Sequence, residues 1–400
     1  MKTVSPDYDC VIVGAGLVGI AQAIALQQSG LNVALLDTRQ PSTATSSTDQ
    51  RGLALSPSSQ TFLRELGLWD DLASVVQPIC EIHVSDQGHF GATRMNARDA
   101  GLEALGYVCP ANRLLETLES ALVNDVDISW QTNLEHIDLA SDRVLLRVRD
   151  SAGEREFSTR LLVGADGLNS IVRESSGIES RTHDYGQSAI VANVTLSYAQ
   201  QDTAYERFTR CGPMALLPLR NGRHVVVRCC ENAQLEALLC ASDADFLASL
   251  DAGFGHRFGL FSELSKRSAH SLSLSWAKRI TGRRLALVGA AAVTIHPNGA
   301  QGLNLGLRDV AELARCVSIA LKAGDDIGGE RCLAEFATAR HADHRAIVRF
   351  TDMMAQISSS SLAPISALRN LAMLGLDIIP PAKNWLIRQA TGALVLTYRH

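Results

Sequence analysis

Residues 9–19 read DCVIVGAGLVG, and residues 32–37 read NVALLD. The apolar run before the glycines predicts a buried strand, residues 16–30 have the composition of a helix, and residues 32–36 predict a second strand. A strand, a crossover helix and a neighbouring strand form a βαβ unit, whose strands are parallel. This stretch therefore predicts an α/β fold built on a parallel sheet.

The glycines of this unit have the spacing of a dinucleotide-binding turn. Gly14, Gly16 and Gly19 form GxGxxG between strand and helix, where the backbone can approach a pyrophosphate at the helix N-terminus. Asp37 follows about 20 residues on, where a carboxylate can accept hydrogen bonds from ribose hydroxyls and repels a 2′-phosphate. A glycine turn that only packs a helix on a sheet would have the same local sequence. The motif predicts a nucleotide site without separating NAD from FAD.

The rest of the chain predicts a nucleotide-binding domain that is interrupted by a second domain. Short strands dominate residues 179–275, which is typical of a β-sheet domain. A strand at 285–288 and a helix from 302 to 322 then resume the first pattern. The predicted parts are 1–178 and 276–330 for the nucleotide-binding domain, 179–275 for a mostly β substrate domain, and 331–400 for a C-terminal helical region.

Composition argues against several classes of protein. A net charge of −5 and a pI near 6.1 lack the basic character expected of a nucleic-acid partner. The nine cysteines contain no CxxC pair, so neither a zinc site nor a disulfide framework is expected, and no metal is predicted. Neither a secretory signal nor an apolar run of about 18 residues is found. We expect a cytoplasmic protein, with peripheral contact at the inner face of the membrane left open.

Three further segments carry a family resemblance. Residues 164–167 read GADG and precede Ser170 and Arg173, and Asn112-Arg113 leads a predicted helix. The segment 289–309 contains Pro297, Gln301, Gly302, Asn304 and Asp309. In order and spacing, and across the whole chain, these segments and the glycine turn resemble the FAD-dependent aromatic hydroxylases of the p-hydroxybenzoate hydroxylase type. The resemblance implies a discontinuous FAD-binding Rossmann-like domain, an inserted mostly β substrate domain and a C-terminal helical tail.

The resemblance also implies FAD as cofactor and NAD(P)H as co-substrate. The reduced flavin then activates O₂, and one oxygen atom is transferred to an electron-rich phenol ring. A second GxGxxG is absent, so the nicotinamide would bind transiently near the flavin. Asp166 could instead belong to a simple strand-end turn, and Arg113 could be an ordinary surface arginine. The implied cofactor-binding residues are Gly14, Gly16, Gly19, Asp37, Arg51, Arg113, Asp166, Gly167, Gly289, Gln301, Gly302, Leu303 and Asn304.

Finer strings point to one branch of this family. They are DQRGLAL at 49–55, HFGATR at 89–94, ALGYV at 104–108 and QGLNLGLRD at 301–309. These resemble the ubiquinone-biosynthesis hydroxylases, and within them the 2-polyprenyl-6-methoxyphenol hydroxylases. The resemblance implies a polyprenyl phenol substrate and contact with a quinone-biosynthesis complex.

The catalytic candidates lie in the second FAD motif. His296 is the candidate to remove the phenol proton, although the loop backbone could equally satisfy this histidine. Pro297 belongs to the loop that the family presents to the flavin ring. We expect the sheet of 179–275 to roof that ring, with residues 289–304 on the opposite wall, because the reaction needs water excluded.

This sequence departs from the family pattern in the same motif. Ala290 and Val293 stand where the family has Asp and His, and Ala300 replaces a usual glycine. The missing Asp would hydrogen-bond the ribitol chain of FAD, a loss of about 1–2 kcal/mol or roughly tenfold in affinity. FAD binding is expected to survive this loss.

Three other interpretations follow from the sequence. The departures suggest a non-catalytic FAD-binding subunit of a quinone-biosynthesis complex. A flavin-dependent prenyl reductase would share the FAD motifs and use no O₂. A halogenase is disfavoured, because its WxWxIP motif is absent and the tryptophans are scattered.

The segment 358–400 combines basic and apolar residues, so it could touch an anionic membrane or form core or homo-oligomer helices.

Overall fold

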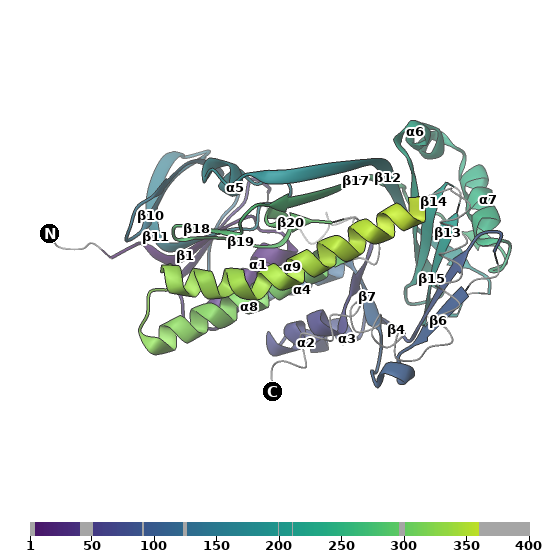
Figure 1. Cartoon of the computed structure of the whole chain (residues 1–400), viewed down its shortest axis with the longest axis horizontal. Coiled ribbons are helices and arrows are strands. Elements are labelled where there is room, and N and C mark those ends of the chain that lie inside the picture. Colours follow the sequence, from purple (N-terminus) through teal and green to yellow (C-terminus); the bar gives the residue numbers. More distant parts are fainter. Residues whose placement is uncertain are drawn as a thin grey trace.

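The computed structural model describes residues 5–40, 51–89, 92–122, 126–198, 200–209, 211–295 and 301–359. Two sheets lie at opposite ends of an elongated molecule, and two long helices run between them (Figure 1). The α/β class predicted from the sequence is confirmed.

The first sheet contains the predicted βαβ unit. β1 (Tyr8–Val13) pairs in parallel with β2 (Val33–Leu36) and with β11 (Gly153–Gly164). In β1, Cys10, Val11 and Ile12 are fully buried, as expected for a continuous apolar strand covered on both faces. The other strands are β8 (Asp127–Ser129), β9 (Asn133–Leu139), β10 (Val144–Asp150), β18 (Thr281–Gly282) and β19 (Leu285–Leu287). The strand order is β18-β19-β11-β1-β2-β8. In addition, β10 pairs with β11, and β9 pairs with β10.

Helices cover this sheet. α1 (Leu17–Gln27) packs beside α8 (Gln301–Ala323), and α8 packs beside α9 (Glu330–Ser359) (Figure 1). Buried residues of α8 recur at helical spacing, so one face of this helix forms part of the core. Helical structure was predicted for both segments, and α9 is longer than the interval 333–357 over which its apolar spacing is clear.

The second sheet is mostly antiparallel. Its strands are β12 (Ser180–Leu196), β13 (Thr203–Thr209), β14 (Gly212–Pro218), β15 (Arg223–Glu231), β16 (Phe261–Ser262) and β17 (Ser268–Ala277), joined by β5 (Glu81–Asp86), β6 (Ala92–Asn96) and β20 (Val293–Thr294). The order is β20-β17-β12-β15-β14-β13-β5-β6, with β16 beside β12. The sheet thus extends beyond 179–275, because β5 pairs in parallel with β13 and β20 pairs with β17.

The two faces of the second sheet have different neighbours. The outer face carries Met214, Leu216 and Val226, which pack in one cluster with Phe246 and Phe254 of α7 (Asp243–Phe254). α6 (Asn232–Cys240) also lies against β12 and β15. We call the opposite side the inner face.

A small sheet lies against the inner face. It consists of β3 (Gly52–Leu55), β4 (Gln77–Ile79) and β7 (Gly106–Pro110). Val108 of β7 packs with Ala204 and Val225 of the second sheet. The approach is close: a Cβ at Gly52 would lie 2.4 Å from Val225 Cγ2. The remaining elements are α2 (Pro57–Glu65), α3 (Trp69–Ala73), α4 (Ala111–Ala121), α5 (Ile171–Ser175), η1 (Arg98–Ala100) and η2 (Gly289–Ala291).

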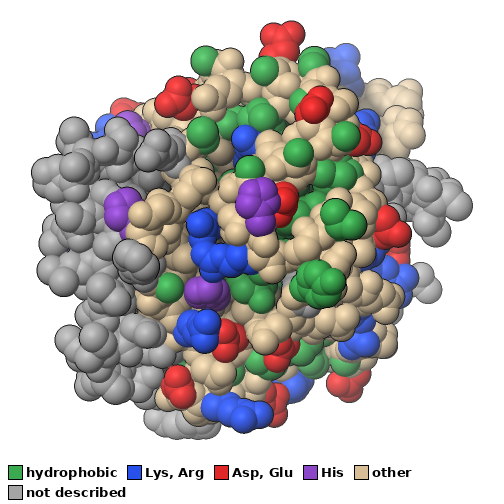
Figure 2. All heavy atoms as spheres, turned by 90° about the vertical axis from the view of Figure 1, so that its right-hand side faces the viewer, with side chains coloured by type: hydrophobic (Ala, Val, Ile, Leu, Met, Phe, Trp, Pro, Cys, Tyr) green, Lys and Arg blue, Asp and Glu red, His purple; other side chains and the backbone are tan. Residues whose placement is uncertain are grey.

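At the end formed by the second sheet, the described residues that face the viewer in Figure 2 form no single-sign patch. Figure 2 shows basic, acidic and apolar side chains intermingled on that face. Of the helices in the described ranges, none is long and apolar enough to cross a membrane. The cysteines are all free thiols. The predicted membrane-contact segment 358–400 lies outside the described residues from 360 onward.

Candidate functional site

Three sequence motifs meet at one edge of the first sheet. The Gly14 N–H donates to the Leu36 carbonyl (2.7 Å), and the Ala165 N–H donates to the Val13 carbonyl (2.8 Å). The Val288 N–H donates to the Gly164 carbonyl (3.0 Å). The carboxyl ends of β1, β2, β11 and β19 therefore lie together. β1 has β2 on one side and β11 on the other, and ligands of open α/β sheets bind where the strand order reverses in this way.

The glycines of the first turn have different roles. Gly14 has φ +104°, and a Cβ there would lie 2.5 Å from the Ala165 carbonyl oxygen. A Cβ on Gly19 would lie 1.8 Å from the Gly14 carbonyl oxygen. A Cβ on Gly16 would meet nothing within 4 Å. Gly14 and Gly19 are therefore required by the packing of the protein itself, whereas Gly16 borders open space.

That open space lies at the N-terminus of α1. Gly16 is the N-cap residue and no side chain caps the helix, so the N–H groups of the first turn are available to a ligand. Such a helix terminus suits a pyrophosphate through its N–H groups and its dipole. The residues present fit the phosphates of FAD.

Asp37 lies at the end of β2, as predicted. Its side chain is 9% exposed; Oδ2 accepts from the Ala15 N–H (2.6 Å) and Oδ1 from the Arg39 N–H (2.7 Å). The Arg39 guanidinium also pairs with this carboxylate at 3.2 Å. A carboxylate accepts about four hydrogen bonds, and two of those to Asp37 come from backbone N–H groups. The hydroxyls of a ribose would therefore take the positions of the Arg39 guanidinium and leave the two backbone hydrogen bonds in place. Arg39 is 46% exposed and can move aside.

The GADG turn is fixed by its own side chains. Asp166 Oδ2 accepts from the Val172 N–H (3.0 Å), and no described residue pairs with the buried Oδ1. Burial raises the pKa of Asp166, and the hydrogen bond from Ser170 opposes that rise. Gly167 has φ +86° with open space at its Cβ position. Asp166 thus shapes the turn and keeps one oxygen for a bound group.

Arg173 joins this turn to the second FAD motif. Its Nη2 donates to the Leu168 carbonyl (2.8 Å), and its Nη1 donates to the Ala291 carbonyl of η2 (3.0 Å). In the same motif, Gly289 has φ +60°, and its Cβ position lies 3.1 Å from Val18 of α1. The two motifs and α1 therefore form one continuous unit.

The start of α8 is tied to the small sheet. Asn304 Oδ1 accepts from the Ser56 N–H and from the Ser59 hydroxyl, both at 2.7 Å, and Nδ2 donates to the Ala54 carbonyl at 2.9 Å. The Asn304 amide is thus used in positioning α8 against β3. Gln301 is buried beside it, Leu303 is partly buried, and Gly302 is exposed with open space at its Cβ position.

The remaining predicted residues are spread more widely. Arg51 Nη1 lies 2.7 Å from His270 Nε2 and so connects the segment before β3 to β17 of the second sheet. Arg113, 52% exposed, pairs at 3.0 Å with Glu116 on its own helix. His296 and Pro297 lie outside the described residues. Their catalytic roles stay predictions.

A buried charge network behind the second motif was missed by the sequence interpretation. Asp309 is fully buried and accepts from the Gly289 N–H (3.0 Å), from Arg340 Nε (2.7 Å) and from His344 Nε2 (2.7 Å). Burial raises its pKa, but His344 and Arg340 lower it further, to about 2. Asp343 adds ion pairs to Arg340 (2.6 Å) and to Arg308 (3.2 Å). α9 thereby supports the backbone of the cofactor motif.

A signal for this network exists in the sequence. Arg340 and His344 are four residues apart, which places them on one face of a helix. Buried charges at such a spacing need partners. The partner is Asp309, which resemblance had singled out without a role.

The position of Ala290 makes the missing family carboxylate testable. Ala290 is exposed although its neighbours in η2 are buried, so a longer side chain can be placed there without a clash. We expect Ala290→Asp to tighten FAD binding by up to about tenfold, through one charge-assisted hydrogen bond. Ala290→Asn is the uncharged control and should gain less. Titration of apoprotein with FAD measures both, and an unchanged Ala290→Asp affinity would show that the ribitol lies elsewhere.

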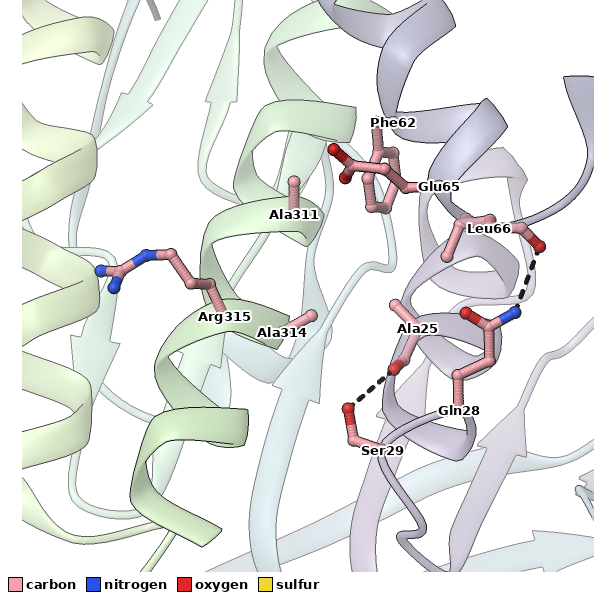
Figure 3. Close-up of a pocket in the computed structure, with 9 residues that line it drawn as sticks. All are labelled: Ala25, Gln28, Ser29, Phe62, Glu65, Leu66, Ala311, Ala314 and Arg315. Atoms are coloured by element: carbon pink, nitrogen blue, oxygen red, sulfur yellow. Dashed lines mark hydrogen bonds between the residues drawn. The ribbon is translucent and has the colours of Figure 1, made fainter. Parts of the chain in front are cut away.

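A groove on the helical side is separate from this site. It has a volume of about 550 Å³ and lies between α1, α2 and α8 (Figure 3). Gln28 donates to the Leu66 carbonyl across it (3.1 Å). Ala25, Gln28 and Ser29 line it from the C-terminal end of α1, opposite to Gly16. The groove is therefore not the cofactor site.

Comparison with known proteins gives consistent matches. Residues 7–351 match the FAD binding domain family. Ubiquinone hydroxylase UbiL of Rhodospirillum rubrum is 34% identical over 405 residues, covering 97% of this chain and 90% of that protein. The 3-demethoxyubiquinol 3-hydroxylase of Escherichia coli is 29% identical, covering 96% and 98%. The crystal structure of p-nitrophenol 4-monooxygenase PnpA from Pseudomonas putida superposes with a TM-score of 0.78 at 19% identity, covering 98% and 99%. At that identity the structural likeness shows the fold alone.

Proposed function

This chain belongs to the FAD binding domain family of flavin-dependent monooxygenases, and from that premise we propose that it hydroxylates a polyprenyl phenol in ubiquinone biosynthesis, with NAD(P)H and O₂ as co-substrates. The observation that carries the proposal is the open, uncapped N-terminus of α1 at the point where the three FAD motifs meet. FAD, when bound, supplies the activation of O₂.

Different residues of the site would bind different parts of FAD. The N–H groups of α1 behind Gly16 would bind the pyrophosphate, and Asp37 would bind the ribose. Asp166 and Gly167, joined by Arg173 to η2, would lie against the flavin side of the molecule. The protein's own part in the reaction is to hold the ring and exclude water.

The substrate class rests on three supports. The relatives at 34% and 29% identity are named for ubiquinone hydroxylation. The finer sequence strings resemble the 2-polyprenyl-6-methoxyphenol hydroxylases. The inner face of the second sheet is largely apolar, which suits a prenylated ring. We also propose that the protein meets its lipid substrate by peripheral membrane contact or within a quinone-biosynthesis complex, as a monomer or a homo-oligomer.

A second candidate is a non-catalytic FAD-binding subunit. Val293 favours it, because this residue is buried in β20 and supplies no titratable group at the position of the family histidine. The prenyl reductase differs from both in leaving O₂ unused.

Turnover with a short-chain prenyl phenol distinguishes these candidates. FAD-loaded protein is mixed with NADH or NADPH, the phenol and O₂, and hydroxylated product and H₂O₂ are quantified. We expect substrate-dependent NAD(P)H oxidation with more product than peroxide. Peroxide alone, or no NAD(P)H oxidation, would favour the non-catalytic subunit. Double-bond reduction without O₂ would favour the reductase.

A further inference from the structure

The inner face of the second sheet carries an apolar wall with a carboxylate in it. Partly exposed apolar side chains form the wall, whereas the outer-face residues next to them in sequence, Met214, Leu216 and Val226, are buried. Val191, Leu217 and Val227 pack against the cluster that contains Val108 of the small sheet, and each still keeps some accessible surface, so protein covers this face only in part. The wall consists of Val84, Val191, Ala215, Leu217 and Val227.

Strand pairing places Glu206 on this wall. Glu206 on β13 lies opposite Ala215 of β14 and opposite Val84 of β5. Its neighbour Tyr205 points to the outer face, where its ring lies 4.6 Å from that of Phe258. Because successive side chains of a strand point to opposite faces, Glu206 points to the inner face.

Glu206 is deeply placed and has no described partner. Protein surrounds it, and this burial raises the pKa of its carboxyl group above the ordinary value; no hydrogen bond or ion pair with another described residue opposes the rise. Part of the side chain nevertheless stays accessible. Glu206 is therefore a deep carboxylate on the apolar wall that keeps some accessible surface and has no hydrogen-bond or ion-pair partner among the described residues, so a ligand lying on this wall can pair with it.

Two other titratable groups near Glu206 do not replace it. Cys229 of β15 is close to Glu206, and burial raises the pKa of its thiol to about 12, so it stays protonated near neutral pH. Asp86 lies at the end of β5 and has its own contact with His89 at 3.7 Å. β14, the direct neighbour of β13, contributes no titratable side chain.

We propose that the Glu206 carboxylate receives the proton of the substrate's phenol hydroxyl and so orients the ring on the apolar wall. This inference rests on the proposed hydroxylase function. The phenol O–H bond breaks and a Glu206 O–H bond forms, which makes the ring a better nucleophile. After oxygen transfer, the attacked ring carbon loses its hydrogen as a proton to water, and the ring oxygen regains a proton from Glu206. Glu206 thus returns the proton that it took.

Binding tests the contact without turnover. The FAD-loaded protein is titrated with a short-chain prenyl phenol and with its methyl ether, which lacks the O–H group, and the flavin absorbance is followed. We expect the wild type to bind the phenol about tenfold more tightly than the ether, and Glu206→Ala to bind both within about twofold. Glu231→Gln, which changes an exposed carboxylate at the end of β15, is the control and should keep the preference. Equal binding of both compounds by the wild type would overturn the proposal.

Phenol acidity tests the proton transfer. We expect Glu206→Gln to form product about 100-fold more slowly than wild type, with partial recovery in Glu206→Asp. The ratio of the wild-type rate to the Glu206→Gln rate should fall below about tenfold for fluorinated phenols of lower pKa, because these phenols lose their proton more readily without a base. A Glu206→Gln rate equal to wild type, or a deficit independent of phenol acidity, would overturn the proposal. A wild type that prefers the phenol but makes no hydroxylated product would contradict the hydroxylase function and leave the Glu206 contact standing.

Discussion

Gly16→Val is expected to give a folded protein that has lost FAD. A Cβ at this position meets no protein atom within 4 Å, and Gly16 has φ −78°, a backbone conformation open to any residue. The valine would instead occupy the space in front of the α1 N-terminus, where the pyrophosphate is expected. We expect FAD affinity to fall at least about 100-fold, while the thermal midpoint of the apoprotein stays near that of wild type.

Gly19→Ala provides the contrast. Its Cβ would lie 1.8 Å from the Gly14 carbonyl oxygen, so this variant should destabilise the apoprotein itself. Flavin titration and thermal unfolding of both apoproteins separate the two effects. Retention of FAD by Gly16→Val at wild-type affinity would show that the cofactor does not use this helix terminus.

Asp309→Asn is expected to lower the free energy of unfolding by about 3–5 kcal/mol. The change removes the buried negative charge that contacts Arg340 and His344, so that Asp343 remains as the carboxylate partner of Arg340. The amide can still accept from the Gly289 N–H. Urea unfolding of the apoprotein measures the loss. Glu312→Gln, on the same helix, breaks a surface pair with Arg315 at 2.6 Å and should cost no more than about 1 kcal/mol.

The same variant has a defined pH dependence. The folded-state pKa of Asp309 is lowered to about 2, below its ordinary value of 3.8. A carboxylate with a lowered pKa stabilises the fold above the unfolded-state value, and this stabilisation is lost as pH falls through the folded-state value. The stability gap between wild type and Asp309→Asn should therefore be full above about pH 4 and narrow as pH falls toward 2. A gap that is unchanged by acid would contradict a charge-based role for Asp309.

Local signals in the sequence predicted the cofactor half of the molecule well. The strand, glycine turn and helix around Gly14 lie within one short stretch, so spacing alone predicted their arrangement. The motifs at Asp166 and Gly289 were found by resemblance, and the structure brings both to the same sheet edge. The residues that resemblance assigned to cofactor contact include Asn304, whose side chain also ties α8 to β3; its contact with the cofactor stays a prediction.

The features that the sequence did not predict depend on contacts between residues far apart along the chain. The parallel pairing of β5 with β13 joins residues more than a hundred positions apart, and neither strand indicates the other. For the same reason Glu206 was not singled out. In the stretch AYERF the alternation of side chains is clear, but only the packing of Tyr205 against Phe258 shows which face is which. The role of Arg340 and His344 depends on the packing of α9 on α8, which brings both side chains to Asp309.

The origin of the inserted oxygen tests the monooxygenase function most directly. FAD-loaded protein is supplied with NAD(P)H, a short-chain prenyl phenol and ¹⁸O₂ in ordinary water, and the product is analysed by mass spectrometry. A flavin-dependent hydroxylase incorporates one labelled oxygen atom into each product molecule, and Gly16→Val forms none of this product. Unlabelled hydroxylated product, or labelled peroxide without any hydroxylated ring, would contradict the function proposed for this protein.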